Sequence, residues 1–318
     1  AQYKFNDYKS ADDLGINKIT FNNEDTTENN IKQSSIFWVR NQINTPALDK
    51  SPEEFIQNVN NLVESSDVNV EVFDQKWLEE NNFGGVLGVA KGSDRAPYLV
   101  VGKYNEKAKY QIALIGKGVL FDSGGYSLKS PAGMETMKTD MSGAASAWGV
   151  INLVARTNQD IGLTVYTPIV ENMVSGSAIR PGDVLKARNG KTIEVLNTDA
   201  EGRLIMADAL AFAAESNPDL ICDIATITGA SYVALGLDVG AVFSNNKDVD
   251  MNNLPDNGSV SVGFQKGADS ILGSLIGKNG SGSAQRRMDN VKMNQEGLLD
   301  SRQNDRGEIL SQQQQQQS

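Results

Sequence analysis

Short apolar runs alternate with stretches of helical spacing along this chain, and that alternation constrains the fold more than any other feature. Strands are expected at residues 68–73, 98–101, 112–115, 163–170 and 220–224. Helices are expected at residues 31–42, 75–81, 142–156 and 204–215. Apolar runs bounded by glycine or charge are typical of buried strands. The sequence therefore predicts an α/β fold, with a mixed, mostly parallel sheet flanked by helices.

Two local signals predict where a helix begins and where a hairpin turns. In Ser51-Pro52-Glu53-Glu54, Ser51 is the expected N-cap, Pro52 lies in the first turn and Glu54 completes a capping box. Asn189-Gly190 lies between two short strand-like segments, residues 184–188 and 192–195, and predicts a β-hairpin.

The composition excludes several classes of function. The absence of histidine removes Ser-His-Asp triads, Cys-His pairs and HExxH zinc sites. Cys222 is the only cysteine, which excludes a disulfide framework and a cysteine-based zinc site, and fits a reducing, intracellular location. The net charge of −11, with scattered basic residues, argues against nucleic-acid binding. No apolar run is long enough to span a membrane.

A first candidate segment, GKGVLFDSGGYSLK, begins at Gly116, directly after an expected strand, and continues through Met137 to Asp140. Ligands of open α/β sheets bind beyond the carboxyl ends of the strands, so this position favours a functional site. Taken alone, the segment also fits a glycine-rich turn with solvated charges. It is not a phosphate-binding loop, because the GK[ST] ending is missing.

A second candidate segment, NTDAEGR, occupies residues 197–203. Asp199 and Glu201 are two positions apart on an expected loop, so both carboxylates can point into one cavity, with Arg203 behind them. Taken alone, the segment also fits a helix start, in which Asp199 caps the helix expected near Leu204.

Together the two segments indicate a site for cations. Four carboxylates lie at expected strand ends: Asp122, Asp140, Asp199 and Glu201. Clustered carboxylates repel one another unless cations hold them, and oxygen-rich sites suit Mg²⁺ and Mn²⁺ and are tolerated by Zn²⁺. Two such ions would generate hydroxide near neutral pH and polarise a carbonyl. A two-metal phosphoryl-transfer enzyme would use a similar cluster and remains an alternative.

These segments, with MKTDMSGAAS between them, closely resemble the signature segments of the leucyl aminopeptidase family, from about residue 37 to residue 246. The resemblance implies a cytoplasmic two-metal aminopeptidase that removes Leu- or Met-like residues from peptides with a free N-terminus. It also implies a homo-hexamer, with Zn²⁺ and/or Mn²⁺, or else Mg²⁺ or Co²⁺, as cofactors, and with bicarbonate as general base.

The family resemblance also implies a role for each matching position. The ligands of a tightly held metal would be Lys117, Asp122, Asp140 and Glu201. Those of a more exchangeable metal would be Asp122, Asp199 and Glu201. Lys129 matches a catalytic lysine that stabilises an oxyanion, and Arg203 matches the arginine that holds bicarbonate. The pocket for the first side chain would include Met137, Thr226 and Gly229.

Three regions follow from the resemblance: a polar linker or remnant of an N-terminal domain (1–30), a catalytic domain (31–246), and a divergent or wrongly assigned C-terminal segment of that domain (247–318). No packed core is expected for most of the last region, which contains a Gly/Ser-rich stretch and six consecutive glutamines and lacks the family's HLDIAG-like segment. This departure leaves open a catalytically silent relative with a binding or structural role, although all seven charged active-site positions are present.

Overall fold

The computed structural model describes residues 27–236, 240–245 and 258–263, together with Tyr3, Phe5, Asp7 and Tyr8. All of them belong to one compact unit, Ala1–Leu272. The Gly/Ser-rich stretch and the glutamine run noted above lie outside the described residues.

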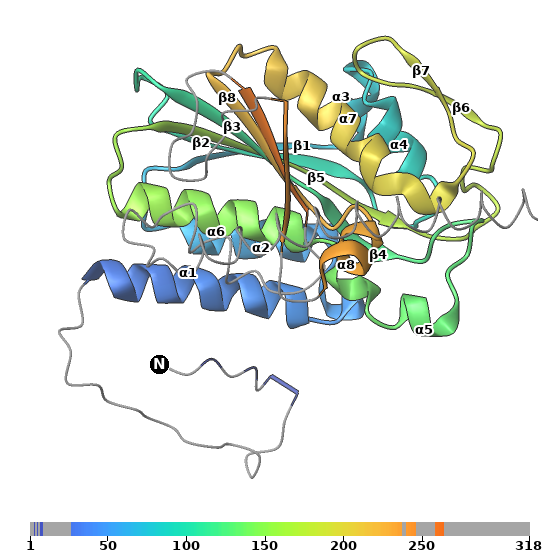
Figure 1. The fold of residues 1–318 in the computed structure, drawn as a ribbon, viewed down its shortest axis with the longest axis horizontal. Helices are drawn as coiled ribbons and strands as arrows, with labels where there is room; N and C mark the ends of the chain where they lie inside the picture. The colour runs from blue at the N-terminus through green and yellow to red at the C-terminus, as the bar shows by residue number, and fades with distance from the viewer. Residues whose placement is uncertain are drawn as a thin grey trace, which may run out of the picture. The chain divides into compact units, whose positions relative to one another are not determined.

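An eight-stranded sheet forms the centre of this unit (Figure 1). Its strands lie in the order β1 (Asn69–Phe73), β2 (Tyr98–Tyr104), β5 (Gly162–Asn172), β3 (Gln111–Gly116), β8 (Leu220–Ala225), β10 (Gly258–Gly263) and β9 (Ala241–Ser244), and β4 (Gly118–Asp122) pairs with the end of β5. The central pairings β5–β3, β3–β8, β8–β10 and β4–β5 are parallel, and the outer pairings are antiparallel. The prediction of a mixed, mostly parallel sheet is confirmed.

Helices cover both faces of the sheet (Figure 1). One face carries α6 (Ser142–Arg156), which packs on β3, β5 and β8, with α1 (Thr27–Asn44) and α2 (Pro52–Val63) outside it. The other face carries α7 (Glu201–Ala214), α4 (Gly84–Ala90) and α3 (Gln75–Glu80). None of the helices in the described residues has the length and apolar character needed to cross a membrane.

Both local signals are confirmed. The Ser51 side chain accepts from the Glu54 N–H at 3.1 Å, and Glu54 Oε2 accepts from the Ser51 N–H at 3.3 Å, which is a complete capping box. Strands β6 (Val184–Lys186) and β7 (Thr192–Glu194) pair antiparallel on either side of Asn189-Gly190 and form a separate two-stranded sheet. Patterns between near neighbours in the sequence were thus sufficient for these elements.

Several elements were not expected from the sequence, among them α4, β4 and β10. Helix α4 is glycine-rich because it lies against α7: a Cβ at Gly85 would come within 2.4 Å of the Leu204 carbonyl oxygen. Strand β4 occupies part of the segment that was interpreted as a glycine-rich turn, and it is stabilised by pairing with β5. Strand β10 lies within residues 247–318, where little packed structure was expected, and pairs with β8 and β9.

Close packing between the first turn of α6 and the sheet determines where Lys117 lies. Every residue from Gly143 to Ala155 is buried, and a Cβ at Gly143 would come within 2.1 Å of the Ile224 carbonyl oxygen. The Ala144 N–H donates to the Lys117 carbonyl at 2.8 Å, and the Lys117 N–H donates to the Ile224 carbonyl at 3.0 Å. The carboxyl ends of β3 and β8 therefore meet the first turn of α6 where Lys117 leaves the sheet.

Candidate metal and catalytic centre

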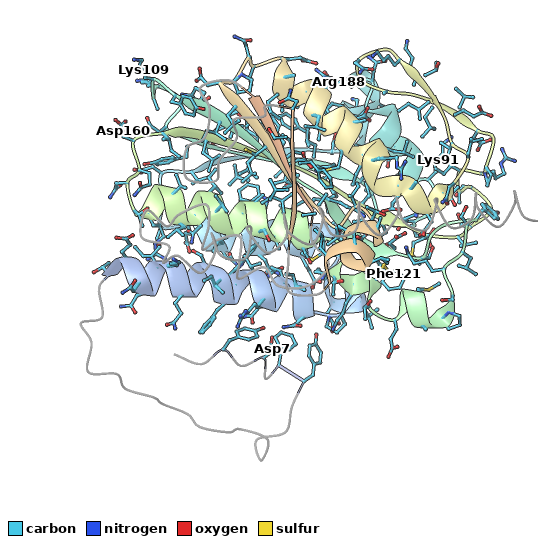
Figure 2. The ribbon with its side chains drawn as sticks, in the orientation of Figure 1. Asp7, Lys91, Lys109, Phe121, Asp160 and Arg188 are labelled. Atoms are coloured by element: carbon cyan, nitrogen blue, oxygen red, sulfur yellow. The ribbon has the colours of Figure 1, made fainter. Side chains whose placement is uncertain are left out.

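The charged residues singled out from the sequence gather beyond the carboxyl ends of β3, β4 and β8 and at the start of α7. Figure 2 labels Phe121, the chain neighbour of Asp122, on this side of the unit, and Asp160 at the other end of the view. Asp160 lies just before Gly162, the residue at which β5 begins, and so marks the amino end of that strand.

One half of the centre is built around Lys117. Its Nζ lies 2.8 Å from Asp140 Oδ1 and 2.8 Å from Glu201 Oε1, and it donates to the Thr226 carbonyl at 2.9 Å. Lys117, Asp140 and Glu201 are 2%, 4% and 2% exposed, so this ion-pair group is almost completely shielded from solvent.

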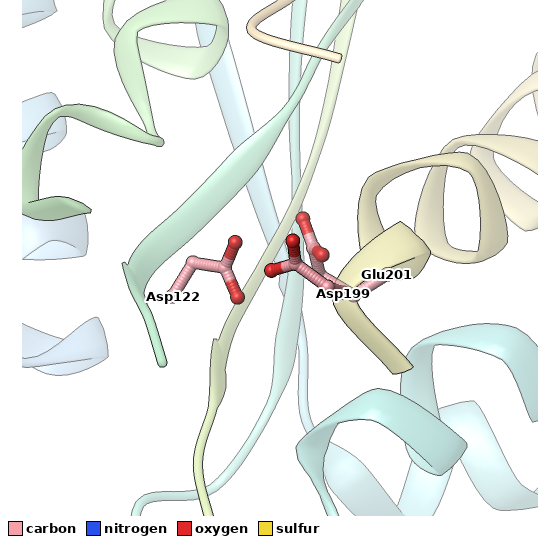
Figure 3. Close-up of side chains that lie close together, drawn as sticks. All are labelled: Asp122, Asp199 and Glu201. Atoms are coloured by element: carbon pink, nitrogen blue, oxygen red, sulfur yellow. The ribbon is translucent and has the colours of Figure 1, made fainter. Parts of the chain in front are cut away.

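The other half is built around Lys129. Its Nζ lies 2.9 Å from Asp122 Oδ2 and 2.5 Å from Asp199 Oδ1. Figure 3 shows the Asp122 carboxylate facing those of Asp199 and Glu201 across the site. One carboxylate oxygen from each of these three residues lies within 4.8 Å of the others, an arrangement that can hold a metal ion.

A glycine turn brings Lys129 back beside Asp122. Gly124 and Gly125 have φ values of +86° and +61°, a region that disfavours residues with a Cβ. The Gly124 N–H donates to Asp122 Oδ1 at 2.9 Å. The Thr198 hydroxyl donates to the Gly124 carbonyl at 2.7 Å and accepts from the Ser127 N–H at 2.8 Å. The turn is therefore tied to the segment that carries Asp199.

The segment around Asp199 is helical rather than the expected loop, although the carboxylates of Asp199 and Glu201 do come together as expected. Asp199 lies in the short 3₁₀ helix η4 (Thr198–Ala200), and α7 begins at Glu201, three residues before the expected start at Leu204. Ala200 is the N-cap, without a side-chain capping bond, so the alternative in which Asp199 caps this helix is wrong. Glu201 is thus in a helical first turn, where the partial positive charge of the helix end favours its carboxylate.

Burial and mutual repulsion shift the pKa values of the buried acids upward. Burial raises the pKa of Asp140 to about 7 despite the attraction of Lys117, and burial also raises the pKa of Glu201. Burial disfavours the Lys117 ammonium, but Asp140 and Glu201 outweigh burial and raise the Lys117 pKa. The Lys129 pKa is raised in the same way, because contacts with Asp199 and Asp122 outweigh its burial. Two ammonium groups thus face four carboxyl groups.

This centre fits divalent cations. Ionisation of all four carboxyl groups would leave two negative charges that the two lysines do not balance. Asp140 Oδ2 and Glu201 Oε2 are buried and have no hydrogen-bond partner among the described residues. Buried oxygens without a partner are costly, and carboxylate oxygens are the ligands that Mg²⁺ and Mn²⁺ prefer and Zn²⁺ accepts.

Comparison with known proteins agrees with this geometry. The family model described as "Cytosol aminopeptidase family, catalytic domain" matches residues 37–260. The chain belongs to the cytosol aminopeptidase family. This confirms the resemblance inferred from the signature segments.

Relatives from several bacteria match the same region. The chain is 48% identical over 208 residues to a probable cytosol aminopeptidase of Leifsonia xyli subsp. xyli, covering 65% of this chain and 42% of the relative. It is 40% identical over 260 residues to a probable cytosol aminopeptidase of Tropheryma whipplei, covering 78% of this chain and 52% of the relative. Peptidase B of Yersinia pestis is 46% identical over 216 residues, covering 66% of this chain and 50% of the relative. The chain spans about half the length of these curated relatives.

Solved structures share the fold. The 1.8 Å crystal structure of a cytosol aminopeptidase from Coxiella burnetii is similar at a TM-score of 0.65 and 40% identity, covering 69% of this chain and 49% of that chain. The bottromycin maturation enzyme BotP in complex with Mn is similar at a TM-score of 0.66 and 34% identity, with the same coverage.

The remaining predicted residues of this family member lie around the centre. Thr226 is in direct contact with it, because its hydroxyl donates to Asp140 Oδ1 at 2.7 Å. Met137 is half-buried in the 3₁₀ helix η3 (Met137–Thr139), and its carbonyl accepts from the Asp140 N–H at 3.3 Å. Gly229 precedes α8 (Ala230–Leu235). Arg203 is exposed in the first turn of α7, and no ion pair joins it to another described residue.

Sequence reasoning missed Asn172 and the structural part played by Thr198. Asn172 donates from Nδ2 to Asp122 Oδ1 at 2.9 Å and to the Thr198 carbonyl at 3.0 Å. A signal was present: Glu171-Asn172 places two polar residues directly after the apolar run that ends at Val170. Polar residues at the carboxyl end of a buried strand are candidates for the site.

Proposed function

We propose that this chain carries the catalytic centre of a two-metal aminopeptidase that hydrolyses the N-terminal peptide bond of peptides. The main support is the buried centre itself, in which oxygens of Asp122, Asp199 and Glu201 lie within 4.8 Å of one another beside two lysines. Membership of the cytosol aminopeptidase family gives the reaction class.

The ligand sets proposed from the family resemblance agree with this grouping. Lys117, Asp122, Asp140 and Glu201 would hold the tighter ion, and Asp122, Asp199 and Glu201 the more exchangeable one. Divalent ions at such a site supply Lewis acidity toward the carbonyl and lower the pKa of a water molecule. Mn²⁺ is supported by the BotP complex, and Zn²⁺, Mg²⁺ and Co²⁺ are the other candidates.

Lys129 and Arg203 are the proposed catalytic side chains. The Lys129 ammonium would stabilise the negative charge that develops on the attacked carbonyl oxygen, because a fixed cation in a shielded site stabilises an oxyanion strongly. The exposed Arg203 guanidinium would hold bicarbonate, which would supply a general base at the centre. In support of this role, Arg203 lies in the same first turn of α7 as Glu201.

The proposed substrates are peptides with a free N-terminus and a Leu- or Met-like first residue. Half-buried Met137, the methyl group of Thr226 and Gly229 would line an apolar pocket of modest size. A cytoplasmic location is proposed from the names of the relatives, and a homo-hexamer from the family resemblance.

The test is hydrolysis of leucyl-p-nitroanilide by the purified chain, with and without added Mn²⁺. Asp199→Ala and Glu201→Ala should abolish Mn²⁺-dependent release, because each removes a proposed ligand. Asp160→Ala is the matched control: it removes an exposed carboxylate near the amino end of β5 and should leave release unchanged. Folded protein that binds Mn²⁺ and releases no p-nitroaniline would instead support a catalytically silent relative.

A further inference from the structure

The side chain of Asn172 joins the two loops that carry the proposed metal ligands. Asn172 is the last residue of β5, is 2% exposed and lies opposite Asp122 in the parallel β4–β5 register. Its Nδ2 group donates to Asp122 Oδ1 at 2.9 Å and to the Thr198 carbonyl at 3.0 Å. Because Thr198 immediately precedes Asp199, one amide group contacts both ligand-bearing loops.

These bonds distinguish the two oxygens of Asp122. Oδ1 accepts from both the Gly124 N–H and Asn172 Nδ2, each at 2.9 Å. A carboxylate oxygen has about two lone-pair sites, so Oδ1 has no capacity left for another partner. Oδ2 instead faces Lys129 Nζ at 2.9 Å, on the side of the other carboxylates. Asp122 is therefore oriented with one defined oxygen toward the centre.

An amide suits this position better than the alternatives. It donates two hydrogen bonds without adding charge, whereas a lysine or arginine would compete with a bound cation and an aspartate would add a fifth carboxylate. The backbone of Asn172 is held separately, because its carbonyl accepts from the Ser123 N–H at 2.9 Å and from the Ser123 hydroxyl at 2.7 Å. Loss of the side chain alone should therefore leave the strand end in place.

We propose that Asn172 is a positioning residue for divalent-cation binding. It holds Asp122 with Oδ2 toward the centre and fixes the segment of Asp199 and Glu201 relative to it. The proposal rests on the two-metal function proposed above. Groups that hydrogen-bond to a metal-binding carboxylate typically contribute about 10- to 100-fold to metal affinity.

The experiment is calorimetric titration of Mn²⁺ into the full chain after removal of metals with EDTA. Asn172→Leu keeps a similar size without a donor and should weaken Mn²⁺ binding by about 10- to 100-fold. Asn172→Ser should weaken it less, because one hydroxyl can donate to only one of the two acceptors. The matched control is Asn152→Leu, since Asn152 is 1% exposed in α6 and donates to Ser35 Oγ at 2.9 Å, away from the ligands.

The outcomes separate the two proposals. Weaker Mn²⁺ binding by the Asn172 variants, with Asn152→Leu unchanged, supports the positioning role. Wild-type affinity in folded Asn172→Leu, verified by circular dichroism, overturns it, as does equal weakening by Asn152→Leu. If Asn172→Leu does not fold, Asn172→Ser decides by the same criterion. A wild-type chain that binds no Mn²⁺ overturns the two-metal function itself, and this proposal with it.

Discussion

At the scale of single residues, the two lysines of the centre act as internal counterions. Lys117 lies between Asp140 and Glu201, and Lys129 lies between Asp122 and Asp199. The two differ in exposure: the Lys117 side chain is 3% exposed and that of Lys129 is 17% exposed. Lys129 is therefore the one that can move toward a substrate, and while it contacts Asp122 and Asp199 it competes with a cation for them.

Replacing Lys129 with methionine should separate turnover from metal binding. Loss of the ammonium removes the proposed oxyanion stabilisation, so kcat for leucyl-p-nitroanilide should fall by about 100- to 1,000-fold. Mn²⁺ affinity should stay the same or increase, because the competing cation is gone. Kinetics and metal analysis of the same preparation check both, with Lys109→Met at an exposed position as control. Loss of Mn²⁺ from the variant would show that Lys129 supports the ions rather than the reaction.

At the scale of secondary-structure elements, the sequence predicted what short-range patterns determine. The bounds of α6, the Ser51 capping box and the Asn189-Gly190 hairpin were all correct. Helix α4 and strand β4 were missed because tertiary contacts override their glycine content. The charged residues of the centre were found through specific motifs, whereas Asn172 was missed because a single polar residue at a strand end has no motif.

A buried lysine links two elements next to the centre. Lys50 is fully buried, and its Nζ donates to the Gln42 carbonyl in the last turns of α1 at 2.8 Å and to the Lys138 carbonyl in η3 at 2.9 Å. Lys138 Nζ in turn donates to the Asn44 carbonyl at 2.6 Å. The end of α1 is thereby tied to the segment that leads to Asp140. Burial, with a smaller contribution from Lys138, lowers the pKa of Lys50 to about 7.

This lysine predicts a pH-dependent stability. The folded chain releases the Lys50 proton near pH 7, whereas the unfolded chain retains it to about pH 10.4, so the free energy of unfolding should rise with pH between these values. In Lys50→Met that contribution is absent. In urea denaturation, the free energy of unfolding of the wild type should increase from pH 7 to pH 9 by about 2–3 kcal/mol more than that of the variant. If the free energies of unfolding of the two proteins changed in parallel with pH, a depressed pKa of Lys50 would be contradicted.

At the scale of the whole described unit, the centre requires most of the sheet to be in place. Its proposed ligands come from the ends of β3 and β4, from the turn just before α6 and from the start of α7, and α6 and α7 lie on opposite faces of the sheet. Neither α6 nor α7 can shift without separating the carboxylates. Ion binding should therefore stabilise the folded unit as a whole.

Thermal unfolding tests this coupling. Mn²⁺ at about 100 times its dissociation constant should add about 2.7 kcal/mol per site, which corresponds to a rise in Tm of about 5–10 °C. EDTA should reverse the rise. Asp199→Ala should reduce it, because one ion loses a ligand, and Asp160→Ala should retain it. An identical Tm in Mn²⁺ and EDTA would show that the ions do not bind the folded chain.

The separation of the proposed ligands along the chain also determines when they can meet during synthesis. Lys117, Asp122 and Asp140 leave the ribosome before Asp199 and Glu201, with all of α6 and β5 made in between. The nascent polypeptide thus exposes half of the carboxylates while Asn172, Thr198 and the start of α7 are still missing. Binding of the proposed ions by the full set of carboxylates would therefore come after translation has passed residue 201.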